Sequence, residues 1–168
     1  MLLGESHKMV NSITVKDDAV LLMMNHQYVE AAILLLQKLE RNKDASILFN
    51  LGLCCLESEL HEEALKYLEE GLMLFTKTTL TSSKPVIEEI VRKIQSQAKL
   101  SNHYRQPMFT FEIDHFKEMS RDRFLRVLVD VCYILKNKQR IIEINNQIGF
   151  KEYKNIDDIM RKIKEDEE

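Results

Sequence analysis

The sequence predicts an all-α protein built from antiparallel helix hairpins. The 168 residues include only four glycines and two prolines, whereas sandwiches, barrels and phosphate-binding loops use glycine at their turns. Apolar residues also recur at helical spacing along most of the chain. Gly52 lies inside one such run, where glycine costs about 1 kcal/mol relative to alanine. We interpret Gly52 as a point of close helix contact, with Ala64 on the opposite helix.

Composition and charge restrict the function classes. Hydrophobic residues make up 45% of the chain and charged residues 30%, which is typical of a globular domain. The net charge is −3 with both signs mixed along the chain, so no general basic field would hold nucleic acid. The longest apolar runs, 19–24 and 31–36, are too short to span a membrane. With no recognisable leader at the start, we expect a cytoplasmic protein with no membrane partner.

Two helix hairpins are predicted in the first half of the chain. The first has helices at about 13–24 and 28–41. The second has a helix from Ala45 to Glu57 with Asp44 as its N-cap, a turn at 58–60, and a helix from Glu62 to Phe75. Acidic residues at the start of that last helix suit the positive end of the helix dipole.

The second half is predicted to contain a connecting helix, an irregular segment and three further helices. The connecting helix covers 82–100. Phe109, Phe111 and Ile113 alternate, which predicts an extended segment within 101–117. Helices follow from about Arg121, at Lys138–Ile148 before Gly149, and at 156–163. The predicted organisation is therefore repeats with a capping helix (1–100), a connection (101–117) and C-terminal helices on the same domain (118–168).

The two hairpins resemble the tetratricopeptide repeat (TPR) family. Leu48, Leu51, Gly52, Ala64, Leu68 and Gly71 match the family pattern, and a weaker copy 33 residues upstream aligns Ala19 with Gly52 and Ala31 with Ala64. The resemblance covers about residues 12–76 and implies a short right-handed solenoid. It also implies a protein-binding scaffold rather than an enzyme. Residues 124–148 are a possible third repeat, although they lack the small residues at the helix crossing.

By this resemblance, a peptide or helix partner binds a partly apolar concave groove. The expected groove residues are Ile13, Lys16, Val20, Met23, Phe49, Asn50 and Leu53. Lys16 and Asn50 also occupy positions that some family members use to hold a terminal carboxylate, but two residues are a weak match. Two arrangements stay open at this point: the groove is exposed, or residues 109–113 or a C-terminal helix cover it.

Other site types have less support. The five histidines have no i, i+4 partner of metal-binding type, and the chain has no recognisable catalytic or phosphate-binding motif. We therefore expect no metal, cofactor or catalytic residue. The alternative function is a nucleic-acid-binding regulator, in which the basic segment 136–164 forms a helix-turn-helix. Asp157 and Asp158 open its second helix and would face phosphate, which argues against it.

Overall fold

The computed structural model describes residues 18–76 and 89–166, and all regular structure in those ranges is helical. A helix ending at residue 24 is followed by α2 (Tyr28–Leu39), α3 (Ala45–Glu57) and α4 (His61–Thr76). After α5 (Glu89–Leu100) come a short 3-10 turn (His103–Arg105) and α6 (Thr110–His115). The chain ends with α7 (Lys117–Ile134), α8 (Lys138–Ile148) and α9 (Lys154–Glu165). The bounds of α3 and α8 confirm the prediction.

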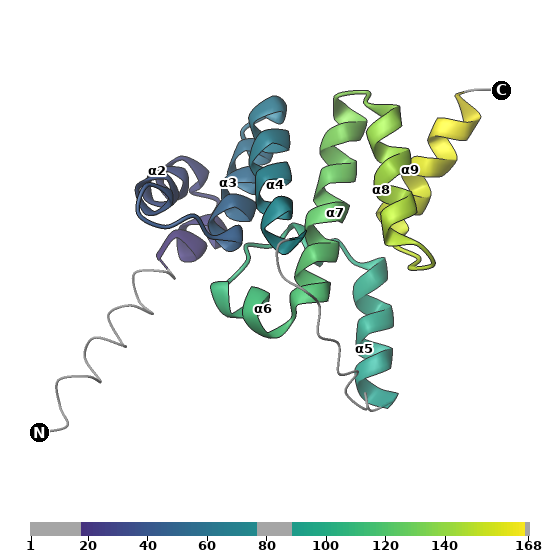
Figure 1. Ribbon diagram of the computed structural model, residues 1–168, viewed down its shortest axis with the longest axis horizontal. Coiled ribbons are helices and arrows are strands. Elements are labelled where there is room, and N and C mark those ends of the chain that lie inside the picture. Colours follow the sequence, from purple (N-terminus) through teal and green to yellow (C-terminus); the bar gives the residue numbers. More distant parts are fainter. Residues whose placement is uncertain (1–17, 77–88, 167–168) are drawn as a thin grey trace, which may run out of the picture.

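The helices pack as one row of neighbours. In this row α2 packs on α3, α3 on α4, α4 on α7 and α7 on α8. Figure 1 shows α3, α4, α7 and α8 side by side, with α2 at one end and α9 at the other. Phe124 of α7 contacts Phe49 of α3 and Phe75 of α4, with ring centroids 4.8 and 5.4 Å apart. The apolar interior therefore continues from the first hairpins into the C-terminal helices.

Three helix hairpins have the same turn geometry. They are the helix ending at residue 24 with α2, α3 with α4, and α7 with α8. His26, Glu59 and Lys136 each have a left-handed backbone, with φ of 60°, 61° and 57°. In each turn the next backbone N–H donates to the carbonyl five residues earlier. These bonds join Gln27 to Leu22, Leu60 to Cys55 and Asn137 to Cys132, at 2.9, 2.8 and 2.8 Å. The hairpin of α7 and α8 thus repeats the local structure of the two upstream hairpins.

Gly52 is a close-contact position, but its nearest neighbour differs from the predicted one. A Cβ added at Gly52 would lie 2.6 Å from Cγ of Leu68, which is fully buried on α4. Leu68 is one turn beyond Ala64 on the same face of that helix. The nearest side chain to Gly52 is therefore Leu68, one helical turn from the predicted Ala64. The glycine is required because no side chain fits beside the leucine.

Two sequence-based expectations about the second half are wrong. Residues 110–115 form α6 rather than an extended strand-like segment. Glu112 explains this, because its Oε1 accepts a hydrogen bond from the backbone N–H of Phe109 at 2.9 Å and so caps the start of the helix. Helix α7 also begins at Lys117, before the predicted start at Arg121. The predicted start of the connecting helix lies outside the described residues.

Candidate functional site

The residues predicted to line an open groove are buried. Val20, Met23, Phe49, Asn50 and Leu53 expose between 0% and 3% of their surface, while Ile13 and Lys16 lie outside the described residues. Of the two arrangements that the sequence left open, the described residues therefore have the covered one. The burial of Phe49 and Asn50 has a specific cause, because Phe124 of α7 packs against the Phe49 ring and the segment before α6 binds Asn50 through Met108.

Asn50 holds the covering segment through its backbone. Its Nδ2 donates to the carbonyl oxygen of Met108 at 2.9 Å, and its Oδ1 accepts from the Met108 N–H at 2.7 Å. Met108 is 1% exposed. Beside it, Phe49 packs against Phe124 on one side, and the guanidinium of Arg123 lies 5.2 Å from the centre of the Phe49 ring. The chain itself thus fills the space predicted for a peptide.

A line of buried charges runs along α7. Asp122, Arg126 and Asp130 recur every four residues and are 4%, 4% and 5% exposed. Asp130 accepts hydrogen bonds from Tyr104, Arg105 and Asn155 at 2.7 to 3.0 Å. The predicted helix from about Arg121 did not include this line. Its signal in the sequence is that residues 122, 126 and 130 are all charged, because a spacing of four places them on one face of the helix.

Arg126 ties three elements to α7. Its guanidinium lies between two aromatic rings, 3.9 Å from the centre of Tyr104 and 4.7 Å from that of Tyr153. It donates to the carbonyl oxygens of Ala98, Lys99 and Ser101, and to Asn155 on α9. Since those carbonyls end α5, Arg126 fixes the C-terminus of that helix.

A cleft of about 580 Å³ opens beside this charged line. We call it the α5–α7 cleft, because residues of both helices form its walls. Its surface is mostly apolar, and its size falls in the usual range of ligand-binding pockets. The lining residues are Gln95, Ala98 and Lys99 of α5; His103, Tyr104, Gln106, Pro107, Phe109 and Glu112; Glu118, Met119, Asp122, Arg123 and Arg126 of α7; and Lys151 and Tyr153.

The apolar wall of this cleft continues along α5. Ile90 and Ile94 precede the lining residue Ala98 at intervals of four, so the three lie on one face of the helix. Ile90 is 59% exposed and Ile94 62% exposed. On the opposite wall Met119 is 45% exposed, and its sulfur lies 3.9 Å from Nε2 of Gln95. An amphipathic helix normally buries such a stripe, so an exposed one next to a cleft indicates a binding surface.

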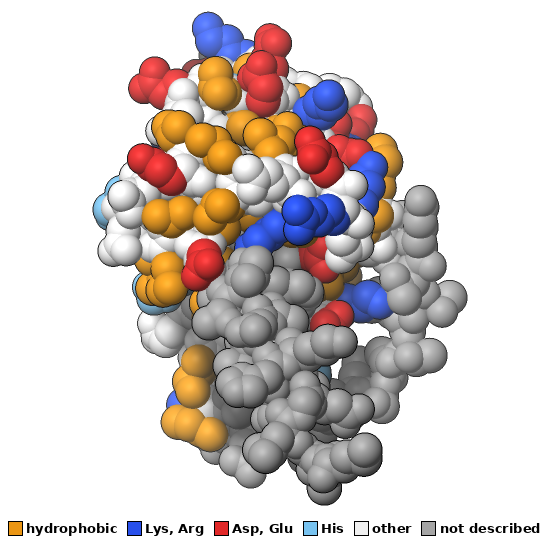
Figure 2. All heavy atoms as spheres, turned by 90° about the vertical axis from the view of Figure 1, so that its left-hand side faces the viewer, with side chains coloured by type: hydrophobic (Ala, Val, Ile, Leu, Met, Phe, Trp, Pro, Cys, Tyr) orange, Lys and Arg blue, Asp and Glu red, His pale blue; other side chains and the backbone are white. Residues whose placement is uncertain are grey.

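A second exposed apolar stripe lies on α2, at the other end of the row. Val29, Ile33 and Leu36 are 67%, 52% and 42% exposed and share one face of the helix. Figure 2 views this end of the molecule and shows hydrophobic side chains in rows between charged ones. This surface is the face of a single helix, whereas the α5–α7 cleft is concave.

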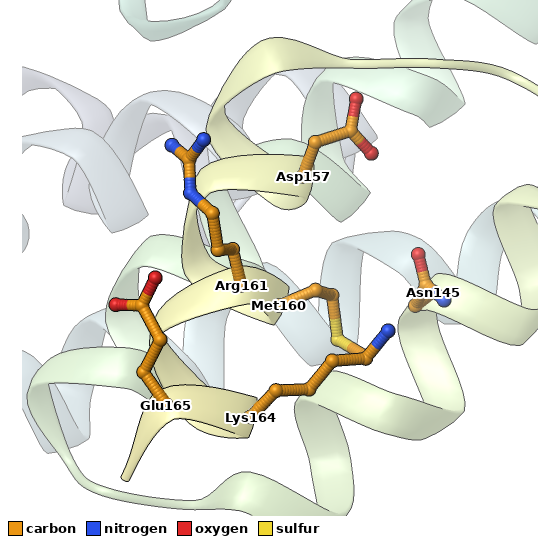
Figure 3. Close-up of a pocket in the computed structure, with 6 residues that line it drawn as sticks. All are labelled: Asn145, Asp157, Met160, Arg161, Lys164 and Glu165. Carbon is orange, nitrogen blue, oxygen red and sulfur yellow. The ribbon is translucent and has the colours of Figure 1, made fainter.

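The basic segment 136–164 does form two helices, α8 and α9, joined by a short turn. A shallow depression on it is lined by Asn145, Asp157, Met160, Arg161, Lys164 and Glu165. Figure 3 shows the two acidic and two basic side chains of this depression around Met160. Arg161 pairs with Asp158 at 2.7 Å. Charges of both signs therefore lie together at this depression.

The cysteines have the character of interior thiols. Burial raises the pKa of Cys54 to about 12 and that of Cys132 to about 11. A thiol with such a pKa is protonated at neutral pH and is a poor nucleophile. Among the described residues no cluster of histidine, cysteine or acidic side chains could hold a metal ion. The same residues contain no helix with the length and apolar character needed to cross a membrane.

No family model, curated protein or solved structure matches the chain.

Proposed function

We propose that this protein is a protein-interaction module that binds an amphipathic helix or peptide of a partner at the α5–α7 cleft. The observation that carries the proposal is the exposed stripe of Ile90 and Ile94 leading into the cleft beside Met119. A partner helix along α5 would bury these three side chains, which is how helix-in-groove complexes gain affinity. The α5–α7 cleft takes the place of the groove expected from the sequence as the binding site, because the chain's own residues cover that groove.

The repeated hairpin supports a scaffold role. We further propose that the hairpins form a short right-handed solenoid of TPR type, acting in the cytoplasm without a cofactor or catalytic residue. The solenoid proposal is supported by the left-handed turn that the three hairpins share, at His26, Glu59 and Lys136. The third hairpin departs from the family pattern, with Val129 and Ile141 where the others have small residues. Larger residues at the crossing would require a wider helix spacing there.

The experiment is a selection of helical peptides against the folded protein, followed by affinity measurements on matched variants. Ile94→Glu should weaken binding at least tenfold, because a carboxylate would be buried without a partner, which costs far more than burying a neutral polar group. Ile33→Glu on α2 is the control, since Ile33 is similarly exposed on another helix. Both variants should keep the helicity and melting temperature of the wild type.

The opposite pattern would contradict the proposal. If Ile33→Glu abolished peptide binding and Ile94→Glu left it unchanged, the interface would lie on α2. Amide chemical-shift changes on adding a selected peptide give an independent map, and they should lie on α5 and the first half of α7. Failure of the library to yield any peptide that binds at this surface would also refute the proposal.

A further inference from the structure

The two ends of the row of helices differ in polarity. At one end, α9 buries its isoleucines and exposes a charged residue at every third or fourth position: Lys154, Asp157, Arg161 and Lys164. Because these positions lie on one face of the helix, water meets a charged surface there. A polar outer face of this kind is what closes the end of a helical array.

The opposite end of the row, at α2, has an apolar outer face. We call it the α2 stripe; it consists of Val29, Ile33 and Leu36, which are 42% to 67% exposed. The other side of α2 packs on α3 and buries Ala31 and Leu35. A helix at the end of an array with an apolar outer face is therefore suited to a partner that is also apolar.

The charges beside the α2 stripe suit an antiparallel copy of the same helix. Glu30 lies in the first turn of α2 and Arg41 two residues past its end, and both are exposed. Their separation of eleven residues is close to three helical turns, and Glu40 keeps helical backbone angles, so both charges lie on the same flank of the stripe. In an antiparallel pair, Glu30 of each copy would therefore face Arg41 of the other. A parallel pair would place like charges together.

We propose that the α2 stripe binds the α2 stripe of a second copy of this chain, forming an antiparallel dimer with two-fold symmetry. The same patch on both subunits makes such an interface self-complementary and closed. Stacking of α2 on α9 of another copy is opposed, because it would bury the charged face of α9 against apolar side chains. The α5–α7 cleft stays open in the dimer, since α5 and α7 lie apart from α2 (Figure 1). A dimer thus presents two clefts to a partner with two binding segments.

Sedimentation equilibrium over a range of protein concentrations tests the dimer. Between about 10 µM and about 1 mM, the mean mass should rise from that of one chain toward that of two, because the face of one short helix gives a small and weak interface. The peptide and melting comparisons of Ile33→Glu are therefore made below about 10 µM, where the wild type is also a monomer. A mass of one chain at about 1 mM, or growth past two chains, would overturn the proposal.

Two matched variants locate the interface. Ile33→Glu should stay monomeric at about 1 mM, because it buries two carboxylates near each other across the two-fold axis. Ile94→Glu is the control, since it makes the same change at a similarly exposed position of α5 and should dimerise as the wild type does. A dimer that persists in Ile33→Glu would overturn the proposal. Loss of the dimer in Ile94→Glu would place α5 in the interface and would overturn it as well.

Charge reversal tests the antiparallel direction. Glu30→Arg and Arg41→Glu each place like charges together across the interface, so each should weaken the dimer about fivefold. The double variant restores opposite charges and should dimerise nearly as well as the wild type. The two positions are about 16 Å apart along the helical path within one chain, too far for contact, so this rescue can come only from pairing between copies. A double variant that is as weak as the single ones would overturn the antiparallel dimer.

Discussion

Asn50 on α3 pairs in both directions with the backbone of Met108, which lies 58 residues later in the chain. One side-chain amide thereby satisfies a buried N–H and a buried carbonyl at once. This pairing fixes the segment before α6 across the face of α3 that the sequence analysis assigned to the groove. It links the first hairpins to the walls of the α5–α7 cleft, since Pro107 and Phe109 flank Met108.

Replacing Asn50 should destabilise the protein strongly. In Asn50→Ala, the N–H and carbonyl of Met108 lose their partners while buried, and each unsatisfied group costs about 1 to 3 kcal/mol. We expect a total loss of about 2 to 6 kcal/mol, measured by urea denaturation. Asn146→Ala, at an exposed position of α8, is the control and should leave the unfolding midpoint unchanged. Equal midpoints for both variants would show that the pairing contributes little.

Gly52→Ala should also destabilise the protein, although alanine favours helix. The added methyl would lie 2.6 Å from Cγ of Leu68, and overpacking of this kind costs about 1 to 3 kcal/mol. Thermal unfolding measures the loss. The variant Leu68→Ala makes room for the methyl, so the double variant should be more stable than the sum of the single effects predicts. Strict additivity would show that the two positions do not interact.

Arg126→Lys should loosen α5 without unfolding the core. A lysine keeps the charge but loses the planar group between Tyr104 and Tyr153, as well as most of the bonds to the carbonyls ending α5. Hydrogen–deuterium exchange should become faster across 89–102. Exchange in α3 and α4 serves as the internal reference and should not change. Faster exchange throughout the molecule would instead indicate global destabilisation.

Stability should fall in alkaline solution. Burial raises the pKa of Cys54 from 9.0 to about 12 and that of Cys132 from 9.0 to about 11. Above pH 9 the unfolded chain therefore loses thiol protons that the folded chain retains, so the free energy of unfolding decreases as the pH rises toward these values. Below about pH 8 these thiols should have no effect, because both states keep them protonated.

Urea denaturation at a series of pH values tests this prediction. Burial likewise raises the pKa of Tyr104 and Tyr153 above 10.0, so the tyrosines add to the decrease at higher pH. Cys132→Ala removes one titrating thiol and should make the decrease shallower between about pH 9 and 11. An identical pH dependence in this variant would show that Cys132 does not contribute.

The error about the groove has a physical origin in α3. The family pattern predicts a core face and a groove face on this helix, yet Phe49, Asn50 and Leu53 are buried together with Leu48 and Leu51. A helix that is apolar on nearly all sides is buried on all sides. The composition of α3 is therefore a signal for a central helix, and it outweighs the family pattern at these positions.

Local patterns in the sequence determined where the helices lie. Apolar spacing, the Asp44 cap and Gly149 depend on residues within a few positions, and the structure has helices at Ala45–Glu57 and Lys138–Ile148 as predicted. The tertiary structure alone decided which faces are covered and where a cleft opens. Asn50 meets Met108, and Asp122 meets Lys151, only because distant helices pack together. Such contacts depend on how the helices are placed in space, which helical periodicity does not encode.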